Sequence, residues 1–109
     1  MVGGTPEAAG LIVARRIVVR PEAEQESLEV QRWYDTRRDG LGREFALAVD
    51  HLLTRIVARP LAFPRAHRET RRAVLTRFPY AIYFRFSDAD VVVLAIHGRQ
   101  DPSRWKARS

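Results

Sequence analysis

The sequence of 109 residues contains no cysteine, which excludes disulfide scaffolds, thiol nucleophiles and thiolate zinc sites. Its three histidines lie at scattered positions without a second ligand at metal-binding spacing, so we expect no metal and no other cofactor. The longest apolar run, Val91 to Ile96, is far short of the roughly 20 residues needed to cross a bilayer. We therefore expect a cytoplasmic protein that does not bind a membrane.

Common catalytic motifs are also missing, because the sequence has no Walker-type phosphate loop, GxGxxG turn, HExxH helix or GxSxG elbow. Lysine is almost absent, because the sequence has eighteen arginines and a single lysine, Lys106. Residues 1–60 hold nine arginines and nine acidic residues, whereas residues 61–109 hold nine arginines and Lys106 against four acidic residues. The net charge of +6 therefore lies in the second half, which favours an anionic partner such as a nucleic acid or an acidic protein segment.

The length and the first residues indicate one domain behind a short leader. A chain of this size has no material for a second hydrophobic core. Residues 1–14 include three glycines and a proline and show no sustained periodicity. We therefore expect a flexible lead-in over residues 1–14 and a single domain over residues 15–109.

Two amphipathic helices are predicted in the first half. Pro21 begins the first helix, three glutamates follow in its opening turns, and Asp39-Gly40 ends it. Leu41 begins the second helix, and Pro60 closes it. Apolar or small residues recur at helical spacing in both; they are Ala23, Ser27, Val30, Tyr34 and Arg37 in the first helix, and Leu41, Phe45, Val49, Leu52 and Ile56 in the second. The short break predicts an antiparallel hairpin whose apolar face covers a third element.

Short β-type runs make up the rest of the chain. One covers residues 17–20, and three follow a proline- and arginine-rich loop at 60–70, over residues 72–78, 80–86 and 91–97. The third of these is apolar on both faces up to Ile96, which predicts an interior strand, and residues 87–90 have the composition of a hairpin turn. The order is β-α-α-β-β-β, an α+β fold with a small, mostly antiparallel sheet and an N-terminal helical hairpin on one face. A short helical turn is expected after residue 100.

One enzymatic reaction remains open to such a chain without a metal. Cleavage of RNA through its own 2′-hydroxyl needs a base, an acid and cations around the phosphate. Arg72, Arg77, Arg85, His97 and Arg99 would supply these groups if one sheet face brought them together. His97 is the main candidate proton carrier, because arginine stays protonated at neutral pH. The alternatives are an anion-binding face without chemistry and a histidine that is hydrogen-bonded at a strand end.

Four segments together resemble the RelE/ParE superfamily of bacterial type II toxins. They are VVRPEAEQESLEVQRWYDTR, GLGREFALAVDHLLTRI, FPRAHRETRRAVLTRFPYAIYFRF and VVVLAIHGRQDPSRW, and they cover roughly residues 16 to 105. The resemblance implies a small sheet with a helical hairpin packed on it, in agreement with the order inferred from periodicity. It also implies a toxin that arrests growth, as in plasmid stabilization systems.

The superfamily has two branches with different targets. RelE-like members are ribosome-dependent endonucleases that cut mRNA, and ParE-like members act on DNA gyrase. The nuclease branch has an arginine before the position of Tyr80 and a C-terminal tyrosine near Trp105, and this sequence has neither. The resemblance therefore implies a ParE-like gyrase inhibitor. The alternative is a RelE-like nuclease with Arg72, Arg77, His97 and Arg99 in its site, and a more distant one is a non-toxic nucleic-acid-binding domain.

Both branches imply a cognate antitoxin whose acidic, partly disordered C-terminal segment wraps the toxin in a hetero-oligomer. The positive charge of residues 61–109 fits such a partner, because it steers an acidic segment to the surface. Exposed tryptophans would serve as anchors, and core packing is the other interpretation for them. The residues expected to bind the antitoxin or the target are Trp33, Arg65, Arg68, Arg71, Arg72, Arg85, Arg99 and Trp105.

Overall fold

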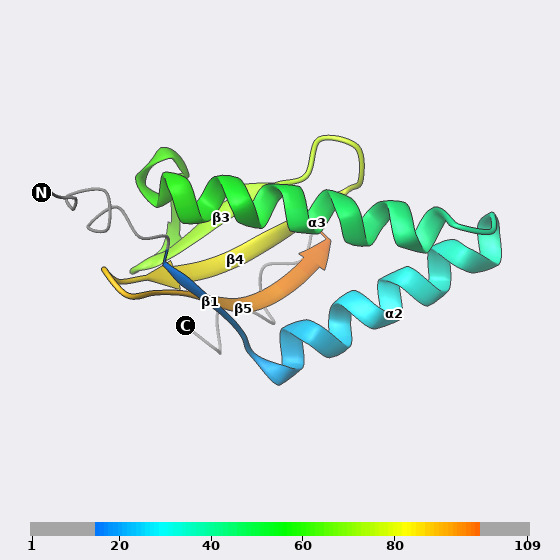
Figure 1. Cartoon of the computed structure of the whole chain (residues 1–109), viewed down its shortest axis with the longest axis horizontal. Helices are drawn as coiled ribbons and strands as arrows, with labels where there is room; N and C mark the ends of the chain where they lie inside the picture. Colours follow the sequence, from blue (N-terminus) through cyan, green and yellow to red (C-terminus); the bar gives the residue numbers. More distant parts are fainter. Residues whose placement is uncertain (1–14, 99–109) are drawn as a thin grey trace, which may run out of the picture.

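A five-stranded sheet and a helical hairpin form residues 15–98, the part of the chain that the computed structural model describes (Figure 1). In chain order the elements are β1 (Arg16–Val19), α2 (Pro21–Arg37), α3 (Leu41–Ala58), the 3₁₀ helix η1 (Pro60–Ala62), β2 (Arg65–His67), β3 (Thr70–Val74), β4 (Tyr80–Phe86) and β5 (Asp90–Gly98). The strand order across the sheet is β1-β5-β4-β3-β2, and every pairing is antiparallel except that of β1 with β5. The predicted α+β architecture is confirmed.

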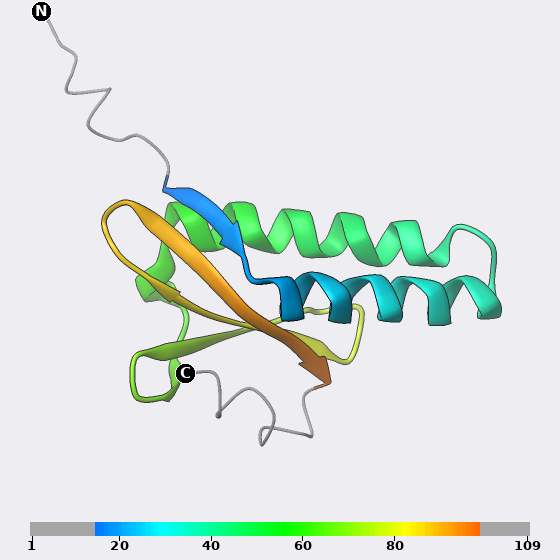
Figure 2. The same ribbon diagram turned by 90° about the horizontal axis from the view of Figure 1, so that it is seen from below.

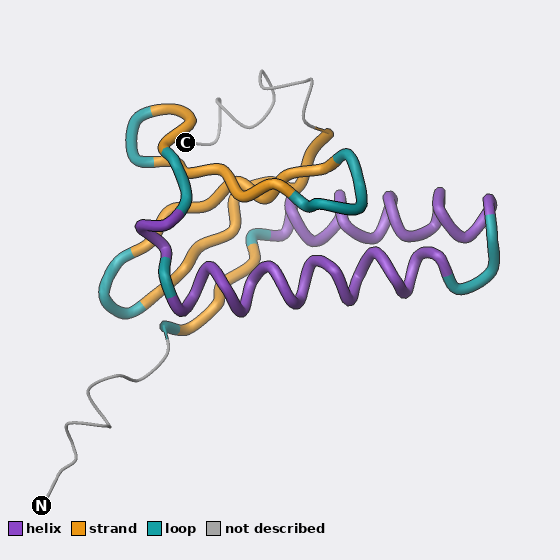
Figure 3. The backbone as a smooth tube through the Cα atoms, turned by 90° about the horizontal axis from the view of Figure 1, so that it is seen from above, coloured by secondary structure: helices purple, strands orange, loops and turns teal. Residues whose placement is uncertain are grey.

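Both helices lie on one face of the sheet, antiparallel to each other, and Figures 2 and 3 show the hairpin and the sheet as two layers. The apolar stripe predicted for α3 is confirmed, because Phe45, Val49, Leu52 and Ile56 are buried. They pack with residues of β4 that include Ile82 and Phe84, in a single core between the helices and the sheet. Burial of each such side chain contributes about 1.5–3 kcal/mol to stability, so this core holds the two layers together.

The turn between the helices is fixed by two glycines. Gly40 has a φ of 84°, the left-handed region that residues with a Cβ rarely adopt, and it lies directly before α3, within the break that the sequence predicted. The amide of Gly42 donates a hydrogen bond to Oδ1 of Asp35 at 2.8 Å. A Cβ at Gly42 would meet the backbone oxygen of Gln31 at 2.4 Å. The absence of a side chain at Gly42 therefore allows the two helices to approach closely.

The inward face of α2 differs from the predicted stripe. Ala23 is buried and Tyr34 packs against the core, as expected, but Arg37 is exposed. Glu26, which was not part of the predicted stripe, is instead buried, with 8% of its surface exposed. The difference arises because α2 follows β1 and passes beside β5, so its inward face meets the edge of a strand as well as the apolar core.

The strands also show three differences from the sequence prediction. Residues 65–67 form β2 within the segment expected to be a loop, β3 covers 70–74 rather than 72–78, and residues 75–79 form a turn. This turn is closed by a 3.0 Å hydrogen bond from the backbone amide of Leu75 to the backbone carbonyl oxygen of Tyr80. The interior position of β5, between β1 and β4, was predicted correctly. The lead-in at 1–14 and the helical turn expected after residue 100 lie outside the described residues.

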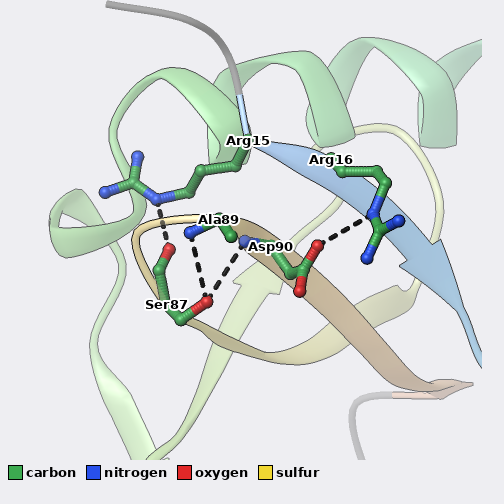
Figure 4. A network of polar contacts seen from close by, with 5 residues as sticks. All are labelled: Arg15, Arg16, Ser87, Ala89 and Asp90. Atoms are coloured by element: carbon green, nitrogen blue, oxygen red, sulfur yellow. Dashed lines mark hydrogen bonds and ion pairs between the residues drawn. The ribbon is translucent and has the colours of Figure 1, made fainter. Parts of the chain in front are cut away.

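The turn at residues 87–90 joins β4 to β5 as predicted, and Figure 4 shows how β1 is attached to it. The hydroxyl of Ser87 accepts hydrogen bonds from the amides of Ala89 and Asp90, both at 3.2 Å. The Nε of Arg15 donates a hydrogen bond to the backbone carbonyl oxygen of Ser87 at 2.7 Å, and Arg16 forms an ion pair with Asp90 at 3.0 Å. These side chains hold the parallel strand β1 in register with β5.

Candidate functional site

His97, the candidate proton carrier, lies near the end of β5 and is enclosed, with only 6% of its surface exposed. Its Nε2 contacts Oε2 of Glu26, a residue of α2 that is itself buried. The other oxygen of Glu26 accepts a hydrogen bond from the amide of Ile96 at 3.1 Å. The structure thus places His97 in the arrangement given as the alternative at the sequence level, a histidine hydrogen-bonded at a strand end.

The strand register places Arg72 and Arg85 on the same sheet face as His97, as the nuclease interpretation expects, but Arg77 lies elsewhere. Arg72 is opposite Tyr83 in the register, on the sheet face that points away from the helices. Arg77 lies in the turn after β3, where its guanidinium forms an ion pair with Glu44 of α3 and lies 5.1 Å from the centre of the Phe78 ring. The structure therefore does not bring Arg77 onto one sheet face with Arg72 and His97, as the nuclease interpretation requires.

A separate basic region forms at the end of the sheet that carries the turns after β2 and β4. Arg65, Arg71 and Arg85 line one open hollow there, together with Leu61, Glu69, Phe86 and Asp90. Arg65 pairs with Glu69 at 3.6 Å, and Arg71 donates to the Phe63 oxygen at 2.6 Å. Arg68 is exposed in the turn between β2 and β3, with a φ of 52°. Of the residues predicted to bind the antitoxin or the target, Arg65, Arg71 and Arg85 therefore come together around this hollow.

Trp33 lies apart from that region, on the helical hairpin, and 49% of its surface is exposed. The guanidinium of Arg37 lies over its ring, 4.3 Å from the ring centre. Its neighbour Tyr34 packs against the core, as expected at the sequence level. The two remaining predicted residues, Arg99 and Trp105, lie outside the described residues.

Two pKa values at the hairpin depart from their ordinary range. Hydrogen bonds from Arg38 and then from Arg77 lower the pKa of the Glu44 carboxyl, so this group stays ionised in mild acid. Burial raises the pKa of the Tyr34 phenol, and the nearby Tyr80 raises it further. Tyr34 is therefore a neutral packing residue at physiological pH, and Glu44 is an anion that joins α3 to the turn after β3.

The part of the chain that the structure describes has neither a metal-binding cluster nor a membrane-spanning helix. Residues 15–98 contain no group of three or more histidine, aspartate or glutamate side chains arranged to hold a metal ion. Within the same residues, neither helix has the length and apolar composition to span a membrane.

Glu26 is the residue of this region whose position the sequence did not reveal. It appeared there as one of three glutamates near a helix N-terminus, where exposed carboxylates are common. The available signal was its spacing, because Glu26 lies three residues after Ala23 and four before Val30, both on the predicted inward stripe. A carboxylate in such a stripe indicates a buried partner.

Comparisons with known proteins point to one fold. No protein-family model matches the sequence, and no curated protein matches it. Two solved structures of toxin–antitoxin complexes are similar to it. A chain of the chromosomal ParDE system from P. aeruginosa has a TM-score of 0.59 at 14% identity, over 78% of this chain and 96% of that one. A chain of the RelBE2 complex from Mycobacterium tuberculosis has a TM-score of 0.58 at 19% identity, over 80% of this chain and 100% of that one.

These two similarities extend over most of each chain, and they agree with the element order and layering described above. At such low identity they bear on the fold and not on the activity. The chain therefore has the same fold as these two chains, a helical hairpin packed on one face of a small, mostly antiparallel sheet.

Proposed function

We propose that this chain is a ParE-like toxin that inhibits DNA gyrase by binding it in the cytoplasm. The observation that carries the proposal is the enclosure of the one candidate proton carrier, His97, by Glu26. General acid-base catalysis requires the proton carrier and the cations to lie within hydrogen-bond reach of the same reacting group. His97 is enclosed beside Glu26, and Arg77 is paired with Glu44 beside α3.

Enclosure of His97 matters for a second reason. RNA cleavage in a ribosome requires the side chain that moves the proton to touch a large substrate. A ring with 6% of its surface exposed, and with Nε2 already held by a carboxylate, offers little surface for such contact. A toxin that acts by binding a protein needs no proton carrier, so these features favour the protein-directed branch.

The proposal includes a cognate antitoxin. Both similar structures are of toxin–antitoxin complexes, and the basic second half of this chain complements an acidic segment. The hollow lined by Arg65, Arg71 and Arg85 is the part of the described surface that we assign to this segment. Aliphatic and aromatic surface from Leu61 and Phe86 in the same hollow would add apolar contact to the charge attraction.

Induced expression in bacteria tests the proposal. We expect growth arrest with relaxed plasmid DNA, chromosome breaks and intact messages. Phe45→Asp is the matched control, because a carboxylate at this fully buried position prevents folding and should abolish every effect. Arrest accompanied by cleaved messages and normal supercoiling would contradict the proposal and establish the nuclease instead.

A further inference from the structure

A continuous series of aromatic contacts runs from the exposed Trp33 of α2 into the core, with an arginine at each end. Arg37 lies over Trp33 at 4.3 Å, and the Trp33 ring meets Tyr34 edge-on with a centroid separation of 5.1 Å. Tyr34 meets Phe78 at 5.0 Å, and the guanidinium of Arg77 lies 5.1 Å from the Phe78 ring centre. We refer to Trp33 and Arg37 as the Trp33 surface.

The exposed part of this series is held in place by the buried part. Tyr34 and Phe78 both contact Phe45, which is fully buried in the core between α3 and the sheet. A ring that is positioned by such contacts loses little conformational freedom when a partner binds it. The ion pair of Arg77 with Glu44 restricts the second arginine in the same way.

The position of the hairpin makes its end accessible. Figure 2 shows that the turn joining α2 to α3 projects beyond the strands of the sheet. The turn itself is rigid, because the Gly42 amide bonds to Asp35 and the hydroxyl of Thr36 bonds to the Trp33 oxygen at 2.5 Å. Trp33 and Arg37 belong to the last turns of α2, directly before this fixed turn.

We propose that the Trp33 surface docks a carboxylate-bearing segment of the protein target. This inference rests on the proposed function and adds the part of the molecule that meets the target. Tryptophan and arginine are the residues that most often carry binding energy in protein interfaces. The guanidinium of Arg37 over a half-exposed indole attracts a carboxylate, and the indole supplies apolar area beside it.

A nucleic acid fits this surface less well. Base stacking needs an open ring face, and Arg37 covers one face of Trp33 while Tyr34 contacts the ring edge-on. Phosphate binding favours several cations along a track, whereas the cation that contacts this indole is a single arginine, Arg37. The arrangement thus favours an acidic protein segment over a polynucleotide.

Two variants and two matched controls test the inference. Trp33→Ala removes the indole, and Arg37→Glu reverses one charge but keeps the ring. Arg32→Glu makes the same charge change at an exposed position of the same helix, and Leu47→Ala removes an exposed apolar side chain from α3. Each chain is expressed in bacteria to measure growth arrest, and each purified chain is titrated against immobilised DNA gyrase. Circular dichroism verifies that all four variants fold.

Trp33→Ala and Arg37→Glu should each weaken gyrase binding by about 30-fold and relieve growth arrest, whereas the controls should stay within about threefold of the unmodified chain. Full arrest by both variants, or equal loss in Arg32→Glu, would overturn the inference. If the unmodified chain arrests growth without binding gyrase and only the two variants lose arrest, the target is wrong and the docking surface stands. If those variants instead lose cleavage of messages, the partner is RNA and the inference fails. A chain that neither arrests growth nor binds gyrase contradicts both proposals.

Discussion

The carboxylate of Glu26 and the imidazole of His97 form a buried pair that joins α2 to the end of β5. The pair occurs where β1 ends at Val19 and leaves the edge of β5 without a neighbouring strand. Glu26 takes over part of the missing pairing, because its Oε1 accepts the hydrogen bond of the Ile96 amide. One carboxylate therefore satisfies a backbone donor and a side chain that would both be costly to bury alone.

Glu26→Ala should reduce the free energy of unfolding by about 3 kcal/mol, because it leaves the Ile96 amide and His97 buried without this partner. Chemical denaturation measures the loss. Glu29→Ala, three residues further along α2 at an exposed position, is the control and should change stability by less than about 0.5 kcal/mol. Equal stability of the two variants would show that the buried pair contributes nothing.

Gly42→Ala and Gly40→Ala should both lower the free energy of unfolding, but by different amounts and for different reasons. At Gly42 the new Cβ meets the Gln31 oxygen at 2.4 Å and Oδ2 of Asp35 at 2.8 Å, so the helices must move apart. We expect a loss of about 3 kcal/mol, as in overpacked cores. At Gly40 no atom lies within 4 Å, and the cost is the positive φ alone, about 1 kcal/mol. Thermal unfolding of both variants measures the difference, and a smaller loss at Gly42 would contradict the close approach of the helices.

Stability should depend on the ionisation of Glu44. Its pKa is lowered in the folded state by hydrogen bonds from Arg38 and Arg77, so its contribution is present above the unfolded pKa of about 4.3 and is lost as the pH falls through the lowered folded value. Glu44→Gln should therefore destabilise the protein at neutral pH, and the difference from the unmodified chain should shrink at more acidic pH. Urea denaturation over a pH series measures this. A difference that stays constant down to strong acid would contradict the assignment.

Local signals in the sequence predicted the helices well. Pro21, Gly40 and Pro60 each act on the backbone of the residues beside them: α2 begins at Pro21, α3 begins directly after Gly40, and α3 ends two residues before Pro60. The apolar stripe of α3 was also readable, because a helix packed on a sheet buries one face along its whole length.

Pairings between distant segments were not readable. β2 contains three residues in a loop rich in arginine and proline, and it forms because it pairs with β3. The parallel register of β1 with β5 joins residues more than seventy positions apart, and no local pattern encodes it. The carboxylate partner of His97 could not be identified from the sequence for the same reason, because Glu26 lies on α2, 71 residues earlier in the chain.

Titration of the purified chain into a supercoiling reaction of DNA gyrase tests the proposed function most directly. The account predicts that supercoiling falls as the chain is added, and that Phe45→Asp, which should not fold, has no effect. Unchanged supercoiling at an excess of folded chain, together with cleavage of ribosome-bound mRNA by the same preparation, would contradict it.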